Sequence, residues 1–237
     1  MMIKNKKEFL NGIILSLSFL VVLSLIFSPI FGEGRNGLEF SDDLFNKLSK
    51  GSSYFIPGII KKNEGFLGRN FSVDIKMKTN KEARNLALLL ETAGAKTLKQ
   101  GLELKIDGDL GLVLSAILRD AEAMYNNEGT KVTALYGYDE KDVMKNWWRF
   151  LTILDKEFKK ELKISEAKHV SEVCKKAVEP SYNFYGIQAQ NVMQKALLMT
   201  GLLIFYVIYT IWWGLAILYL LEGLGLEMSK AKVKKEM

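Results

Sequence analysis

The sequence is poor in the side chains on which catalytic and metal sites most often depend. Among its 237 residues are one cysteine, Cys174, and one histidine, His169. A single cysteine excludes a disulfide within the chain and a metal site built from several cysteines. A single histidine leaves one position for the commonest general base near neutral pH. No P-loop, dinucleotide-binding fingerprint or Ser/His/Asp pattern is present, and we expect neither an enzyme nor a bound cofactor or metal.

Charged residues are absent from a long stretch near the C-terminus, residues 196–221. The stretch exceeds the roughly 20 apolar residues that a helix needs to cross a hydrocarbon core. A core helix of a water-soluble protein would carry polar residues on one face. The sequence therefore predicts a membrane-spanning helix over residues 196–221.

A second uncharged run follows the lysine-rich residues 1–9. It is longer than the roughly 7–15 residues of a signal-peptide core, and Ile30 occupies a position where signal cleavage would require a small residue. We expect an uncleaved spanning helix over residues 10–31, with a cleaved signal peptide as the alternative.

Lysines lie on the outer side of both apolar stretches, within residues 1–9 and 222–237. Positive flanks stay in the cytoplasm, so both termini are expected inside a cytoplasmic (inner) membrane and residues 33–195 on its periplasmic or extracellular side. The net charge of +6 is thereby interpreted as a topology signal. No basic run alternates with aromatic residues as a nucleic-acid groove would require, and no nucleic-acid partner is expected.

Between the two stretches, residues 33–69 are predicted to be an irregular linker with one short helix, and residues 70–137 a folded domain. Period-two alternation, helix caps and turn residues predict strands and helices in the order β-α-β-β-α-β, at residues 71–77, 80–93, 95–99, 102–106, 110–125 and 132–136. This order is the split βαβ arrangement of a ferredoxin-like α+β domain, in which two helices cover one face of a four-stranded antiparallel sheet. If residues 95–99 form a loop, the order becomes β-α-β-α-β and a parallel sheet is expected.

Residues 138–179 are predicted to form amphipathic helices, and residues 180–195 a juxtamembrane segment. The first helix carries one apolar stripe, consisting of Val143, Trp147, Leu151, Leu154, Phe158 and Leu162. The dipeptide Glu179-Pro180 is expected to break the helix that follows, because proline lacks the N–H that a helix interior uses.

Aromatic residues supply the candidate interface positions. Trp147 belongs to the apolar stripe, whereas Trp148 either flanks it or contacts a partner protein. Tyr182 and Tyr185 are expected near the outer membrane interface, where aromatic side chains favour the headgroup layer.

Trp212 and Trp213 lie deeper in the last apolar stretch than such a layer would place them. We expect them to contact another helix, either residues 10–31 or a helix of a partner. Cys174 is expected to be a buried free thiol, and a disulfide with another chain is the alternative.

Two polar clusters invite a metal site but have simpler interpretations. Glu166, His169 and Glu172 recur every third residue, and a solvated helix face accounts for them, because no second histidine exists. Residues 107–109 (Asp-Gly-Asp) lack the further ligands of a calcium loop and are interpreted as a turn followed by a helix N-cap.

The sequence predicts an accessory or scaffolding subunit of a larger membrane assembly, with the lipid bilayer and other membrane subunits as partners in a homo- or hetero-oligomer. Its extracytoplasmic domain would dock a protein. A ligand-sensing domain is the alternative, and it would need a separate signalling partner because neither terminal segment approaches the roughly 40 residues of the smallest self-folding domains. A membrane-bound enzyme is the third possibility, and no catalytic constellation supports it.

Overall fold

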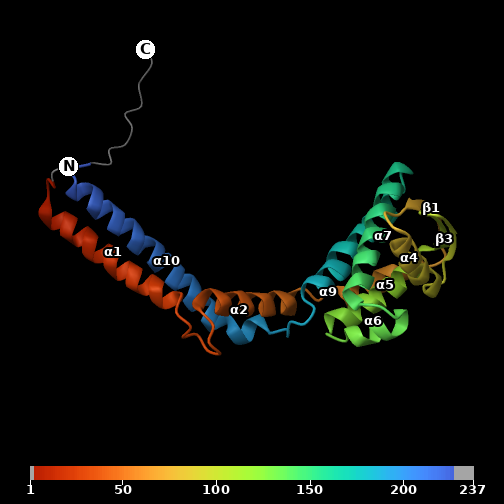
Figure 1. Cartoon of the computed structure of the whole chain (residues 1–237), viewed down its shortest axis with the longest axis horizontal. Helices are drawn as coiled ribbons and strands as arrows, with labels where there is room; N and C mark the ends of the chain where they lie inside the picture. The colour runs from red at the N-terminus through yellow and green to blue at the C-terminus, as the bar shows by residue number, and fades with distance from the viewer. Residues whose placement is uncertain (1–2, 227–237) are drawn as a thin grey trace, which may run out of the picture. The chain divides into compact units, whose positions relative to one another are not determined.

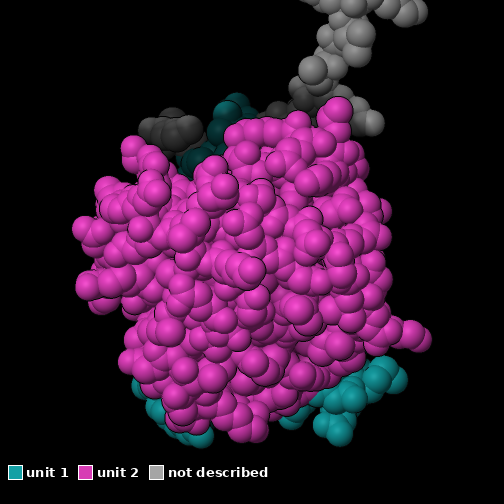
Figure 2. All heavy atoms as spheres, turned by 90° about the vertical axis from the view of Figure 1, so that its right-hand side faces the viewer, with its two compact units in different colours: residues 1–45, 191–237 teal, residues 46–190 magenta. Residues whose placement is uncertain are grey.

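A computed structural model describes residues 3–226 of the chain, which divide into two compact units. Unit 1 joins the described parts of residues 1–45 and 191–237, and unit 2 is residues 46–190; Figure 2 colours them separately. The lysines predicted to fix the orientation of the last span (Lys230, Lys232, Lys234 and Lys235) lie outside the described residues.

Unit 1 is built on two apolar helices, α1 (Lys6–Ile26) and α10 (Val192–Gly223). Both are long and apolar enough to cross a membrane, by length and composition, and they coincide with the two predicted spans except for shifts at their ends. Asparagine side chains cap both N-termini, since Asn5 accepts from the amide of Glu8 and Asn191 from that of Met193.

The two helices pack along each other in opposite directions (Figure 1). Phe19 of α1 stacks on Tyr209 of α10 with ring centroids 4.1 Å apart. Near the start of α1, a Cβ atom on Gly12 would lie 2.7 Å from the backbone nitrogen of Leu220, so glycine permits the close approach. The amide of Lys4 donates to the carbonyl oxygen of Gly223 at 3.0 Å. The start of α1 and the end of α10 therefore lie at the same end of the pair.

The predicted irregular linker is largely helical, which corrects the assignment of residues 33–69. Helix α2 (Gly37–Ser52) begins at Gly37 because Asn36 accepts from the amides of Leu38 and Glu39, while the Glu39 carboxylate accepts from the Asn36 amide. This reciprocal arrangement is a capping box.

Helix α3 (Ile56–Asn63) and the 3₁₀ turn η1 (Glu64–Phe66) follow. Pro57 lies in the first turn of α3, where a proline starts a helix. Ile56 and Ile59 are buried, so this segment packs on the domain.

The sheet of unit 2 has three antiparallel strands in the order β1-β3-β2. The elements are β1 (Asn70–Lys76), α4 (Asn80–Thr92), β2 (Lys96–Gln100), β3 (Glu103–Asp109) and α5 (Leu110–Tyr125). Residues 95–99, which were predicted to be either a strand or a loop, thus contribute to strand β2, and β2 pairs antiparallel with β3. The alternative of a parallel sheet is wrong. Strands β1 and β2, which α4 connects, lie on either side of β3, as in a split βαβ unit.

Local signals position these elements as predicted. Phe71, Val73 and Ile75 are buried in alternation along β1. Thr79 caps α4, and Asp109 caps α5 by accepting from the amide of Leu112 at 3.0 Å. Residues 107–109 lie at the end of β3 instead of in the predicted turn.

The predicted last strand at residues 132–136 is wrong, because these residues lie in helix α6 (Gly129–Tyr136). Val132 and Tyr136, four residues apart, are both buried on one side of this helix. A short apolar run does not by itself distinguish a helix from a strand. The described residues of unit 2 therefore form a mixed α and β fold with a three-stranded sheet, and the four-stranded ferredoxin-like sheet is not confirmed.

The remaining helices are α7 (Glu140–Lys160), α8 (Ile164–Val173), the π-helical turn η2 (Cys174–Val178) and α9 (Glu179–Asn183). The apolar stripe of α7 is buried as predicted except at Leu162, which lies beyond the helix end with a positive φ and is 81% exposed. The expected break at Pro180 is wrong: the amide of Glu179 bonds the carbonyl of Cys174 across the wide turn. Pro180 thereby falls in the first turn of α9, where its missing N–H costs nothing.

A buried carboxylate, Asp120, joins three helices in the core. Its Oδ2 accepts from the hydroxyl of Tyr136 at 2.6 Å and from Nε1 of Trp147 at 2.9 Å, and its Oδ1 accepts from Arg119. Asp120 is 2% exposed, so these bonds replace the water that its charge would otherwise need. The contact confirms that Trp147 belongs to the core.

A buried lysine holds together the places where the chain enters and leaves unit 2. Lys50 of α2 is 2% exposed, and its Nζ donates to Asn127 Oδ1 and to the carbonyl oxygens of Phe184 and Ile187 at 2.7–3.1 Å. Burial lowers the pKa of Lys50. Because all three ammonium protons are directed at oxygens, the segment after α9 is tied to α2.

Replacement of Lys50 by methionine is expected to lower the free energy of unfolding of unit 2 by about 1–3 kcal/mol, because buried oxygens lose their donor. In hydrogen exchange of the full chain in detergent, the amides of Gly186 and Gln190 should be the first to lose protection. Lys61→Met, at an exposed lysine of α3, is the matched control. Unchanged protection of both amides in Lys50→Met would contradict the role of Lys50.

Candidate functional site

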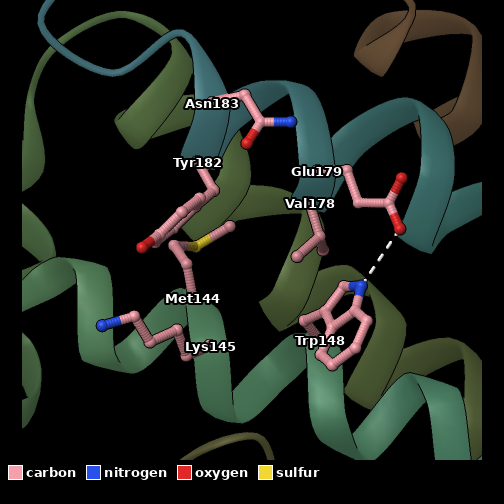
Figure 3. Close-up of a pocket in the computed structure, with 7 residues that line it drawn as sticks. All are labelled: Met144, Lys145, Trp148, Val178, Glu179, Tyr182 and Asn183. Carbon is pink, nitrogen blue, oxygen red and sulfur yellow. Dashed lines mark hydrogen bonds between the residues drawn. The ribbon is translucent and has the colours of Figure 1, made fainter.

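A pocket of about 280 Å³ opens between α7 and the α9 region of unit 2 (Figure 3). Its lining combines apolar, aromatic and charged side chains, which are Met144, Lys145, Trp148, Val178, Glu179, Tyr182 and Asn183. Three come from α7, and the others come from η2 and α9.

The two adjacent tryptophans of α7 have different roles because neighbouring side chains on a helix point about 100° apart. Trp147 points inward and donates to Asp120. Trp148 is 43% exposed and donates from Nε1 to Glu179 Oε1 at 3.0 Å, the dashed contact in Figure 3. This hydrogen bond ties the indole to α9 while one part of its ring remains open to solvent.

The π-helical turn determines which residues of the next helix meet α7. It presents Val178, Glu179 and Tyr182 toward the face that carries Met144 and Trp148 (Figure 3). Met144 and Val178 are buried and form the apolar base of the pocket. Single π-turns inserted in helices often occur at functional positions.

The rim of the pocket is charged. The Nζ of Lys145 lies 5.9 Å from the centre of the Tyr182 ring and 3.0 Å from Asp142 Oδ1. The hydrogen bond to Asp142 raises the pKa of Lys145. The pocket thus offers an apolar hollow with two aromatic walls, an ammonium group on one side and the Glu179 carboxylate on another.

Three of the candidate interface residues meet at or just behind this pocket. Trp148 and Tyr182 line it, and the Sγ of Cys174 lies 3.8 Å from Glu179 Oε1. Cys174 is a free cysteine, 7% exposed, and burial raises its pKa to about 12. It remains a protonated thiol at neutral pH, and a disulfide with another chain would require this region to open.

Tyr185 lies away from the pocket. Its hydroxyl donates to Glu140 Oε1 at 2.8 Å, and Lys141 Nζ lies 5.7 Å from the ring centre. Both Tyr182 and Tyr185 pack against the core of unit 2; their predicted place in a headgroup layer stays a prediction.

In unit 1, Trp213 tilts against Phe19 of α1 with ring centroids 4.6 Å apart. The expected contact with the first apolar helix therefore exists for Trp213. The indole nitrogen of Trp212 is buried and, among the described residues, has no hydrogen-bond partner.

Sequence reasoning missed five lining residues: Met144, Lys145, Val178, Glu179 and Asn183. The signal that could have found Val178, Glu179 and Asn183 is the dipeptide Glu179-Pro180, which was interpreted as the end of a helix. A proline that starts a further helical turn would have kept residues 178–183 beside α7.

The only histidine is buried, which corrects the prediction of a solvated face. His169 is 1% exposed, stacks on Phe66 with centroids 4.0 Å apart, and shares a hydrogen bond between Nε2 and Asn63 Oδ1 at 3.1 Å. Burial, with a smaller contribution from Lys62, lowers its pKa to about 4. The imidazole is therefore neutral at pH 7.

Its two acidic neighbours along the chain form ion pairs. Glu166 pairs with Arg69 at 2.6 Å, and Glu172 pairs with Lys62 and with Lys176. Within residues 3–226, no group of three or more histidine, cysteine or acidic side chains is placed to hold a metal ion.

Comparison with known protein families, with curated proteins and with solved structures finds no match to this chain.

Acid is expected to destabilise unit 2 through His169. Below about pH 6.5 the unfolded chain takes up a proton at this position and the folded chain does not, so the free energy of unfolding falls between pH 6.5 and 4 by up to ~3 kcal/mol. Urea unfolding of the full chain in detergent, measured between pH 7.5 and 5, should show this decline. His169→Gln should be less stable at pH 7 yet lose the decline above pH 5; an equal slope in both proteins would contradict the assignment.

Proposed function

We propose that this chain is an accessory or scaffolding subunit of a membrane assembly, and that unit 2 docks a partner protein at the α7–α9 pocket. The observation that carries the proposal is the partly exposed Trp148 over an apolar pocket whose second wall is Tyr182. Tryptophan and tyrosine are the residues that most often dominate the binding energy of protein interfaces.

A pocket of this size accommodates one large side chain or one small ligand. Pockets for drug-sized molecules range over roughly 300–1,000 Å³, and this one measures about 280 Å³. An apolar or aromatic side chain would occupy the hollow formed by Met144 and Val178. Lys145 and Glu179 at the rim would then pair with opposite charges of the partner and set its orientation.

A ligand-sensing domain is the second candidate, and the same pocket would be its binding site. A small apolar molecule with one polar group could contact Trp148 and Glu179 together. The two candidates differ in what occupies the pocket in the native membrane, so a cross-linking experiment at its rim distinguishes them.

The membrane part of the proposal rests on unit 1. We infer that α1 and α10 cross a cytoplasmic membrane as a hairpin, with both termini cytoplasmic and residues 46–190 on the other side. The Lys4 amide bonds the Gly223 carbonyl, so the two chain ends leave the helix pair at the same end. The lysines of residues 1–9 and 222–237 favour the cytoplasm for that end.

A benzophenone amino acid placed at Asn183, an exposed rim position, is expected to cross-link one partner protein when native membranes are irradiated. Adding Trp148→Ala should reduce the cross-link yield more than about tenfold, because a central aromatic contact is lost. Leu135→Ala, at an exposed leucine of α6, should leave the yield unchanged.

Filling the pocket gives a second test that leaves both aromatic walls in place and removes only the contacts of Lys145 with Asp142 and Tyr182. Lys145→Trp, at an exposed rim residue, should block the cross-link while unit 2 keeps its unfolding free energy. If Trp148→Ala and Lys145→Trp both gave the cross-link in the same yield as the wild-type chain, the docking site would be wrong. Capture of a small molecule instead of a protein would favour the sensing alternative.

For the topology, Thr130→Cys is expected to react with a membrane-impermeant maleimide in intact cells, and Lys6→Cys only after lysis. Thr130 is exposed in unit 2, and Cys174 is buried and gives little background. The opposite labelling pattern would show that unit 2 faces the cytoplasm.

A further inference from the structure

The strand β1 lies at the edge of the sheet with one side unpaired. The strand order β1-β3-β2 leaves it a single neighbour, β3. In the four-stranded arrangement predicted for this domain, the last strand would cover this edge. Here residues 132–136 lie in α6 instead, and no strand within residues 3–226 covers this edge.

The register identifies which backbone groups of β1 face outward. The Met77 amide donates to the Leu102 carbonyl and the Leu110 amide donates to the Arg69 carbonyl, and these two pairs extend the β1–β3 register by one residue at either end. In an antiparallel pair, hydrogen-bonded and non-bonded positions alternate. The odd-numbered residues of β1 therefore bond β3, and the N–H and C=O groups of Asn70, Ser72, Asp74 and Lys76 point away from it.

These four residues are exposed. Within the described part of the chain, no hydrogen bond involves their outward backbone groups. Such a row of free donors and acceptors is a template for pairing with another strand. The partner that it fits can be deduced from the side chains.

We propose that the β1 edge pairs antiparallel with the β1 edge of a second copy of this chain, in a two-fold arrangement centred on Ile75. In this register Asp74 lies opposite Lys76 of the second copy, and Lys76 lies opposite Asp74. Each of these pairs exchanges two backbone hydrogen bonds. Opposite charges directly across an antiparallel pair stabilise it, whereas like charges destabilise it.

Charge complementarity extends beyond the two edge strands. Within one chain, Asp74 already faces Lys105 of β3, and Lys76 faces Glu103. Across the joined sheets, one row therefore reads Glu103, Lys76, then Asp74 and Lys105 of the second copy, with alternating sign. The two-fold axis produces the same row in reverse. Centring the pairing on Asp74 instead would place two aspartates face to face.

The self-complementary arrangement is of the kind that closes into a dimer, because the same patch is used on both copies. The paired edge lies on the sheet, whereas the α7–α9 pocket lies on the helices. The proposed dimer therefore does not depend on the proposed docking function. The dimer would be a six-stranded sheet in which β1 is no longer an edge.

Charge reversal tests the proposal with the full chain in detergent, by sedimentation equilibrium. Asp74→Lys alone, or Lys76→Asp alone, is expected to weaken the dimer by about tenfold, because both edge pairs become repulsive. The double variant with both changes should restore it. That double variant still has like charges opposite Lys105 and Glu103 within each chain, so restoration reports contact between copies and not repair of the fold.

Glu103→Lys with Lys105→Glu is the matched control. It disturbs the same pairs within the chain and leaves both edge residues unchanged, so the dissociation constant should stay at the wild-type value. A wild-type chain that remains monomeric, or a dimer that resists both single reversals, would overturn the proposal. Loss of the dimer in the double variant would overturn it as well.

A disulfide experiment checks the register. Asp74→Cys chains and differently tagged Lys76→Cys chains, expressed together, should form the mixed disulfide under mild oxidation. Ser72→Cys paired with Asp74→Cys should not. Preference for the second combination would exclude pairing centred on Ile75.

Discussion

The hydrogen bonds to Asp120 are the constraint on which the surface of unit 2 depends. This buried carboxylate receives Tyr136 from α6 and Trp147 from α7, and it lies on α5. A buried charge with good partners is costly to disturb from either side, so the rotation of α7 about its axis is fixed. With Trp147 held inward, Trp148 is held outward, and the pocket acquires its exposed wall (Figure 3).

Groups that could carry chemistry are used for packing in this chain. His169 is stacked and buried with a pKa of about 4, and Cys174 is a buried thiol with a pKa of about 12. Lys50, which is also buried, secures the exit segment. Burial lowers the pKa of Lys50 and of His169, raises that of Cys174, and separates all three side chains from solvent. What unit 2 leaves exposed is of a different kind: an aromatic pocket and an unpaired strand edge.

These two features have a common origin in residues 126–140. Because α6 forms there instead of a strand, β1 keeps a free edge, and Tyr136 reaches Asp120 to orient α7. One local choice of helix thus affects both the sheet edge and the helical face. The pocket and the edge are nevertheless lined by different residues, so each can be altered without the other.

Much of the architecture was predictable from local sequence. The uncharged runs predicted α1 and α10. Alternating apolar residues predicted β1 and β3, and the capping residues Thr79 and Asp109 predicted the starts of α4 and α5. These signals are local, because each involves only neighbouring residues of one helix or strand. Tertiary contacts decided the rest. Residues 132–136 are helical because Val132 and Tyr136 meet the core together, Pro180 starts a helix because a π-turn precedes it, and His169 is buried because Phe66 and Asn63 receive it. Asn63 and His169 are far apart in the chain, so no local pattern encodes their contact. At residues 132–136 and at Pro180 the local pattern allowed more than one structure, and packing against the core selected the helix.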